Sequence, residues 1–86
     1  MTQTIALTPR QRDLLQMDTY CEYPEERNPE PEWANLRAEL LAGRRLTVNE
    51  RLLSIVAELA DRDTDPAEQS VYRRLLAKAR AAKAGG

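Results

Sequence analysis

Residues 46–62 read LTVNERLLSIVAELADR and form the longest clear helix pattern in the chain. When successive residues are placed 100° apart, the apolar ones fall on one arc of roughly 160°, wider than the stripe of a typical surface helix. Thr47 followed by Glu50 matches a capping box, which predicts where the helix starts. We therefore expect a helix over residues 47–62 that contacts neighbours on two flanks and lies at the centre of the fold.

The composition favours one small helical domain. The chain has 86 residues, is rich in Leu and Ala and lacks Phe, so we expect a single all-α domain over residues 1–86. No apolar run is long enough to span a membrane, the first residues do not resemble a signal peptide, and Cys21 has no cysteine to pair with. These features predict a cytoplasmic protein with no membrane partner. Arg far outnumbers Lys, which is typical of a GC-rich genome. Small chains without catalytic residues include many phage-encoded proteins, so we expect a small bacterial or phage protein.

Helix-start motifs flank the central helix on both sides. TPRQ at residues 8–11 and DPAE at residues 65–68 are two further capping boxes, each with Pro at the first helical position. The remaining helix has two candidate starts, Pro29 and Pro31, and Gly43 is a good stop. The prediction is a compact bundle of about four helices around the third, with helices over residues 8–20, 31–42, 47–62 and 66–83.

Three segments are expected to lie outside the helices. Residues 1–7 are predicted to be a flexible N-terminal arm, with Ile5 and Leu7 available to pack onto the core. Residues 21–31 contain three prolines, which predict an irregular connector because the residue before a proline is driven away from helical geometry. Residues 84–86 are predicted to fray.

The helix over residues 8–20 has a narrow apolar stripe. Leu14, Met17 and Cys21 lie on one line, and Leu15 lies to the side. A narrow stripe predicts a helix that packs on one flank only, or one that completes its burial on a partner. Because Cys21 is on this line, we expect it to be a small buried thiol instead of a nucleophile.

Charge is segregated along the chain, although the net charge is only −1. Residues 13–32 hold seven acids against Arg27, whereas residues 69–86 hold five basic residues and no acid. Such a distribution can attract a charged partner to either end. The alternative is that the two ends neutralise each other within the monomer.

Patterns for catalysis and metal binding are weak. The chain has no His, the commonest acid–base group and zinc ligand. Asp61, Asp63 and Asp65 match the start of a calcium loop, but Pro66 and Tyr72 stand where that loop needs Gly and Glu. A glycine-rich phosphate loop is also absent from the sequence. We therefore expect no enzyme activity, no metal and no cofactor.

Binding to another protein is the function that we predict, as a regulatory module of the adaptor or inhibitor type with a partner that the sequence does not name. Tyr and Trp beside acids and prolines are typical of recognition surfaces. They define the first candidate surface, formed by Tyr20, Tyr23, Glu25, Glu26 and Trp33. The alternative is that these rings hold the connector onto the helices. Homodimerisation is a further use for apolar surface on the first two helices.

The basic last helix supplies a second candidate surface. Its solvent side is suited to nucleic acid or to an acidic protein partner, and its candidate residues are Gln69, Ser70, Arg73, Arg74, Lys78 and Arg80.

LTVNE at residues 46–50 follows a Gly-ended helix, and VYRRL occupies residues 71–75, within an overall span of residues 33–80. These two short motifs resemble parts of the winged helix-turn-helix family. The resemblance implies DNA binding with the helix over residues 66–83 as the reader in the major groove. The acids within residues 61–68 oppose that function because they repel phosphates. DNA binding is therefore the alternative to protein binding.

Overall fold

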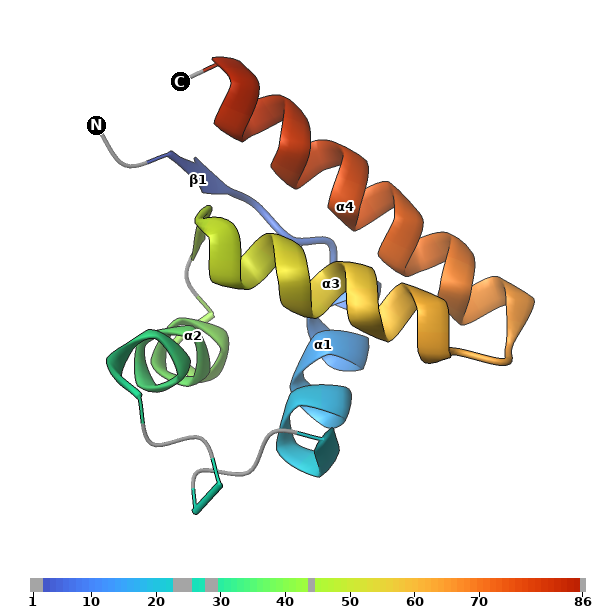
Figure 1. Ribbon diagram of the computed structural model, residues 1–86, viewed down its shortest axis with the longest axis horizontal. Coiled ribbons are helices and arrows are strands. Elements are labelled where there is room, and N and C mark those ends of the chain that lie inside the picture. Colours follow the sequence, from blue (N-terminus) through green and yellow to red (C-terminus); the bar gives the residue numbers. More distant parts are fainter. Residues whose placement is uncertain (1–2, 23–25, 28–29, 44, 86) are drawn as a thin grey trace.

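The computed structural model describes residues 3–22, 26–27, 30–43 and 45–85, except for the side chains of residues 22 and 32. The helices of this described part confirm the predicted small all-α bundle, and one short strand pair accompanies them (Figure 1). In chain order the elements are β1 (Thr4–Ile5), α1 (Pro9–Glu22), α2 (Pro31–Leu41), β2 (Leu46–Thr47), α3 (Glu50–Arg62) and α4 (Pro66–Gly85).

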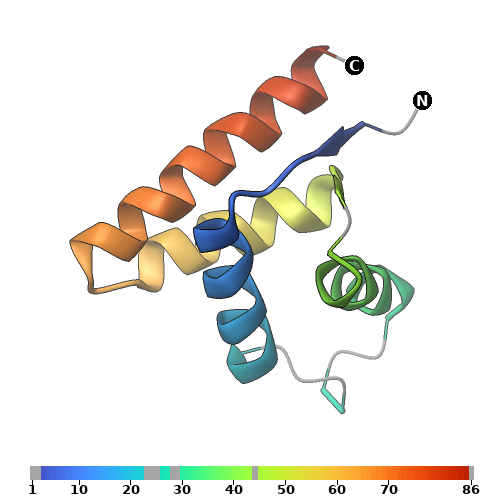
Figure 2. The ribbon, with the colours of Figure 1, turned by 180° about the vertical axis from the view of Figure 1, so that it is seen from behind.

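Helix α3 is central, as its broad apolar arc predicts. It runs between α4 on one side and α1 and α2 on the other, and the front and back views agree on this arrangement (Figures 1 and 2). Its buried side chains are Leu52, Ile55, Val56, Leu59 and Ala60. They meet Tyr72, Leu75 and Ala79 of α4 in one continuous core. Burial of this kind is the main favourable contribution to folding in a domain of this size.

The start of α3 differs from the prediction. Thr47 is not its cap, because the Thr47 amide and hydroxyl both donate to the carboxylate of Glu39 on α2, at 3.2 and 2.7 Å. Asn49 caps the helix instead, accepting the amide of Leu52 at 2.8 Å on its side-chain oxygen, and the helix begins at Glu50. Asn is as good a cap as Thr, and the contact with α2 determines which of the two is used.

A strand pair that the sequence analysis did not predict connects the N-terminal segment to the bundle. Thr4 and Ile5 pair antiparallel with Thr47 and Leu46, and Ile5 is buried. The guanidinium of Arg45 donates to the hydroxyl and the carbonyl of Thr4, at 3.0 and 3.1 Å. Residues 3–7 are therefore held against the bundle, in contrast to the flexible arm expected for residues 1–7.

Helix α1 buries a different face from the one that its apolar stripe indicated. Met17 and Cys21 are exposed, so the prediction of a buried thiol was wrong. The inner face includes polar side chains, which apolar periodicity does not detect. The buried side chains of α1 are Gln11, Leu14, Leu15 and Thr19.

The other helix ends follow the local signals closely. The capping box of α1 is confirmed, because Thr8 and Gln11 each accept the other's amide, at 3.0 and 3.1 Å. Helix α2 starts at Pro31, the second of the two predicted starts, and Gly43 follows its end with a positive φ of 69°. Helix α4 continues to Gly85, two residues beyond the predicted end.

Candidate functional site

The first predicted surface is not assembled as the sequence indicated. Tyr20 and Glu26 are exposed, and Tyr23 and Glu25 lie outside the described residues. Trp33 is only 3% exposed and belongs to the core. We therefore leave Trp33 out of any docking surface. The sequence contained a signal for this burial, because Trp33 begins the apolar stripe of α2.

The Trp33 ring also has a cationic neighbour on α3. The guanidinium carbon of Arg51 lies 5.6 Å from the ring centroid, within the range of a cation–π contact. The ring thus connects the first turn of α2 to the first turn of α3. This contact joins two helices, so the alternative in which the aromatic rings hold the connector onto the helices stays a prediction.

A hollow along the outer side of α1 groups apolar side chains that the sequence analysis did not combine. Met17 and Tyr20 of α1 and Leu41 at the end of α2 are 61%, 49% and 66% exposed, and all three line it. We call this surface the α1 hollow. Its remaining lining residues are Arg10, Asp13, Leu14, Gln16 and Glu68. The narrow stripe of α1 was the one sequence signal for it, since it predicted a helix that completes its burial on a partner.

Polar contacts beneath the α1 hollow hold α1 against the end of α2. The side chains of Arg12 and Gln16 both donate to the carbonyl of Leu40, at 3.2 and 3.1 Å. This carbonyl is in the last turn of α2, where it also accepts the amide of Gly43 at 3.3 Å. The two bonds therefore fix the neighbouring Leu41 relative to α1 while its side chain stays in solvent.

The second predicted surface lies on α4. Some of its side chains form hydrogen bonds within the fold, and the others form none with the described residues. The Lys78 ammonium donates to the Ala6 carbonyl at 2.9 Å and to the Gln11 side chain at 3.2 Å. The Gln69 amide donates to the Ala60 carbonyl at 3.0 Å. Both residues are therefore part of the internal packing. The remaining predicted residues, which are exposed and have no hydrogen bond or ion pair with the described residues, are Ser70, Arg73, Arg74 and Arg80.

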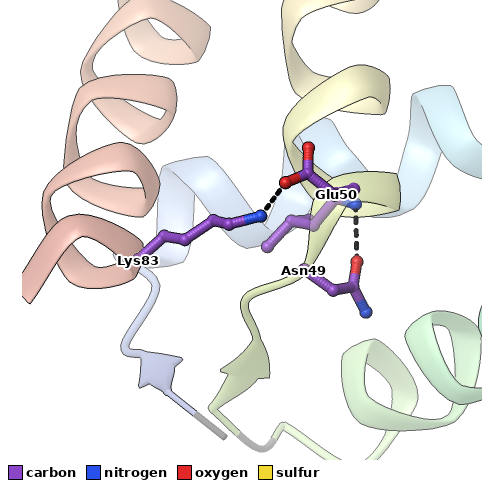
Figure 3. A network of polar contacts seen from close by, with 4 residues as sticks. Asn49, Glu50 and Lys83 are labelled. Carbon is purple, nitrogen blue, oxygen red and sulfur yellow. Dashed lines mark hydrogen bonds and ion pairs between the residues drawn. The ribbon is translucent and has the colours of Figure 1, made fainter. Parts of the chain in front are cut away.

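Neutralisation of the basic helix within the monomer is limited. Lys83 forms an ion pair with Glu50, which joins the end of α4 to the start of α3 beside the Asn49 cap (Figure 3). Among the described residues, α4 makes no other ion pair to another element. The positive charges of Arg73 and Arg80 are left facing solvent.

An acidic group, formed by Asp18, Asp63 and Glu68, lies at the N-terminal end of α4. The Tyr72 hydroxyl donates to the Leu14 carbonyl at 2.9 Å and to the carboxylate of Asp18. Burial and this contact raise the pKa of Tyr72 far above its ordinary value. Desolvation, followed by the neighbouring charge of Asp63, raises the pKa of Glu68. The group therefore makes the beginning of α4 negative, whereas the middle of the helix is positive.

Two other kinds of site have no geometric support in the described part of the chain. No group of three or more acidic or cysteine side chains there is placed to hold a metal ion. No helix among the described residues combines the length and apolar character needed to cross a membrane. No family model, curated protein or solved structure matches the chain. The α1 hollow and the exposed arginine-bearing face of α4 are therefore the two surfaces for which a function can be proposed.

Proposed function

We propose that this chain is a non-enzymatic protein-interaction module, of the adaptor or inhibitor type, that binds its partner through the α1 hollow. The observation that carries the proposal is the grouping of Met17, Tyr20 and Leu41, the large hydrophobic side chains that are exposed in the described residues, around one hollow. Single exposed apolar side chains are ordinary on a monomer. A group of them beside polar residues is typical of a protein-binding site.

The side chains of the α1 hollow suit an anchor residue from another protein. Met is flexible and polarisable and adapts to different apolar surfaces. Tyr combines a large apolar area with a polar tip, and is enriched where interfaces gain most of their energy. Arg10, Asp13 and Gln16 supply a polar edge, as expected around an apolar contact. The hollow therefore favours an apolar side chain surrounded by polar contacts.

The α1 hollow is already assembled before a partner binds, because the position of Leu41 is fixed. Because Arg12 and Gln16 hold the last turn of α2 to α1, the two sides of the hollow do not have to be brought together when a partner binds. An interface whose parts are already placed loses less conformational entropy on association.

The experiment that tests this function is capture from a lysate of the source cells, with the mass of the purified protein measured in parallel. The test variant combines Met17→Ser with Leu41→Ser, which removes apolar area without touching the core. We expect the variant to retain the wild-type melting temperature and to capture at least tenfold less of the partner protein. A second variant, Met17→Leu with Leu41→Met, keeps the apolar area and should retain capture.

The outcomes separate partner classes. If the wild type is a dimer and Met17→Ser with Leu41→Ser makes it a monomer, the partner is a second copy of this chain. If all retained material disappears on nuclease treatment, protein binding is excluded in favour of nucleic acid. Equal capture of the same protein by both variants would show that the hollow is not the contact.

DNA binding by α4 is the second candidate function, supported by the exposed guanidiniums of Arg73, Arg74 and Arg80, which form no ion pair with the described residues. Two features weaken it. The Gln69 amide, a predicted base contact, is bonded to the Ala60 carbonyl. A reading helix usually contacts bases with its N-terminal residues. In α4 that end carries Glu68, next to Asp63 and Asp65.

A further inference from the structure

We propose that the outward face of α4 is a second docking surface, and that its partner is an acidic amphipathic helix of another protein. This inference extends the proposed interaction function to residues separate from the α1 hollow. The face is opposite the core side of the helix, where Tyr72, Leu75 and Ala79 are buried. Figures 1 and 2 place α4 at the edge of the bundle, with α3 on one side of it only.

The exposed residues of α4 form an ordered pattern. At 100° per residue, the exposed residues from Ser70 to Ala84, apart from Lys83, occupy an arc of about 120° on the side away from the core. A strip of small side chains runs along the middle of the arc, with arginines on both edges. Arg73 and Arg80 form one edge and Arg74 forms the other. The strip consists of Ser70, Ala77, Ala81 and Ala84, all exposed.

The small side chains allow a partner backbone to approach α4 closely. Packed helices lie 8–10 Å apart depending on the side chains between them, and small residues favour the short end of that range. From Ser70 to Ala84 the strip is about 21 Å long at 1.5 Å per residue. A partner helix of about four turns would cover it.

The arginines determine the charge of the partner. The guanidiniums of Arg73, Arg74 and Arg80 have no bond or ion pair with the described residues, and residues 69–85 contain no acid. A helix with a small or apolar stripe and carboxylates on both sides of it would place acids opposite each edge. Paired helices use this arrangement at the positions that flank their apolar seam. Arg is also well suited to it, because its planar donors match a carboxylate in two-point contact.

A second copy of this chain and a DNA duplex fit the face less well. Antiparallel two-fold pairing of α4 about Ala77 would place Arg80 beside Arg73 of the second copy, because the two-fold axis brings the same edge of each helix together, and like charges repel. A duplex would bring phosphates towards the acids around Glu68 at the N-terminal end of the helix. An acidic helix confined to the region after Glu68 avoids both conflicts.

The test is direct binding of labelled 21-residue helical peptides to the full-length protein, followed by fluorescence anisotropy. The probe has an Ala and Leu stripe flanked by Glu on both sides, and its neutral counterpart has Gln at every Glu position. We expect the acidic peptide to bind at least tenfold more tightly than the neutral one, with an affinity that falls as salt is raised. Arg73→Gln with Arg74→Gln and Arg80→Gln should weaken binding at least tenfold.

Matched controls separate this surface from the α1 hollow. Arg62→Gln removes one exposed positive charge outside α4 and should leave peptide binding unchanged. Met17→Ser with Leu41→Ser should also leave it unchanged, so failure of the α1 hollow and failure of the α4 face are distinguishable. Equal affinity for both peptides, or no binding of either, would overturn the proposal. Arginine-dependent binding of a 20-base-pair DNA duplex without peptide binding would assign the face to nucleic acid and overturn it as well.

Discussion

Helices α1 and α4 use their two faces in opposite ways. Helix α4 keeps its large apolar and its charged side chains on separate faces, with Tyr72 and Leu75 in the core and Arg73 and Arg80 in solvent. Helix α1 has apolar and polar side chains on both of its faces. It buries Gln11, Leu14, Leu15 and Thr19 and exposes Met17 and Tyr20.

This difference shows that helical periodicity predicts one kind of docking surface and misses another. On α4 the residues of the proposed surface follow directly from helical periodicity, because the polar side is also the outer side. On α1 the apolar side chains of the proposed surface are those that the same rule assigns to the core. An apolar residue outside the core is thus the feature that identifies a possible contact, and periodicity alone does not reveal it.

The largest effect on stability is expected at two residues of α1 whose burial is the reverse of what the apolar stripe predicts. Leu15 is fully buried and Met17 is largely exposed. We expect Leu15→Ala to lower the free energy of unfolding by about 2–5 kcal/mol, because it removes packing and leaves a cavity. Met17→Ala should change it by less than about 0.5 kcal/mol. Urea denaturation of both variants measures the two values, and a larger loss for Met17→Ala would reverse the assignment of the buried face.

The contact between α1 and α4 can be tested with the substitution Tyr72→Phe. The variant removes the hydroxyl that donates to the Leu14 carbonyl and Asp18. We expect the free energy of unfolding at neutral pH to fall by about 1–3 kcal/mol, since the buried Leu14 carbonyl and the half-buried Asp18 carboxylate lose a donor. Chemical denaturation is the measurement, and a loss within error would show that the hydroxyl contributes nothing to joining α1 and α4.

The same variant predicts a pH dependence with a definite sign. The folded state raises the pKa of Tyr72 above its unfolded value near 10. Below that unfolded pKa the stabilisation of the neutral phenol is fully present. Above it the unfolded state loses the proton first, so stability falls by up to about 1.4 kcal/mol per pH unit. Between pH 10 and 11 the wild type should therefore lose stability more steeply than Tyr72→Phe, and parallel curves would contradict the cause given for the shift.

The smallest effect is expected at the polar part of the inner face of α1. The hydroxyl of Thr19 is buried and has no hydrogen-bond partner among the described residues. Thr19→Val replaces it with a methyl group of similar shape. We expect the free energy of unfolding to stay the same or to rise by up to about 1 kcal/mol, because a buried polar group without a partner is unfavourable. A clear loss in thermal or urea unfolding would mean that the hydroxyl is satisfied in solution.

Features that depend on residues close together in the chain could be predicted from the sequence. The capping box of α1 and the Asp65–Pro66 start of α4 located two helix starts, although the Asp65 amide donates to Asp63 and not to Glu68 as a capping box requires. Gly43 marked the end of α2, because these signals act within one helical turn. The broad arc of α3 predicted its central position, since an arc of that width requires neighbours on two flanks. The free arginines of α4 were predicted for the same reason, as the polar side of a strongly patterned helix.

Tertiary structure decided the features that depend on contacts between distant residues. Thr47 lost the capping role to Asn49 because Glu39, eight residues away on α2, takes both of its donors. The β1–β2 pair joins residues more than 40 positions apart, and two-residue strands have no periodicity to detect. The α1 hollow also belongs here. Which flank of a narrow apolar stripe is buried depends on the neighbouring helices, and a single helix pattern contains no information about them.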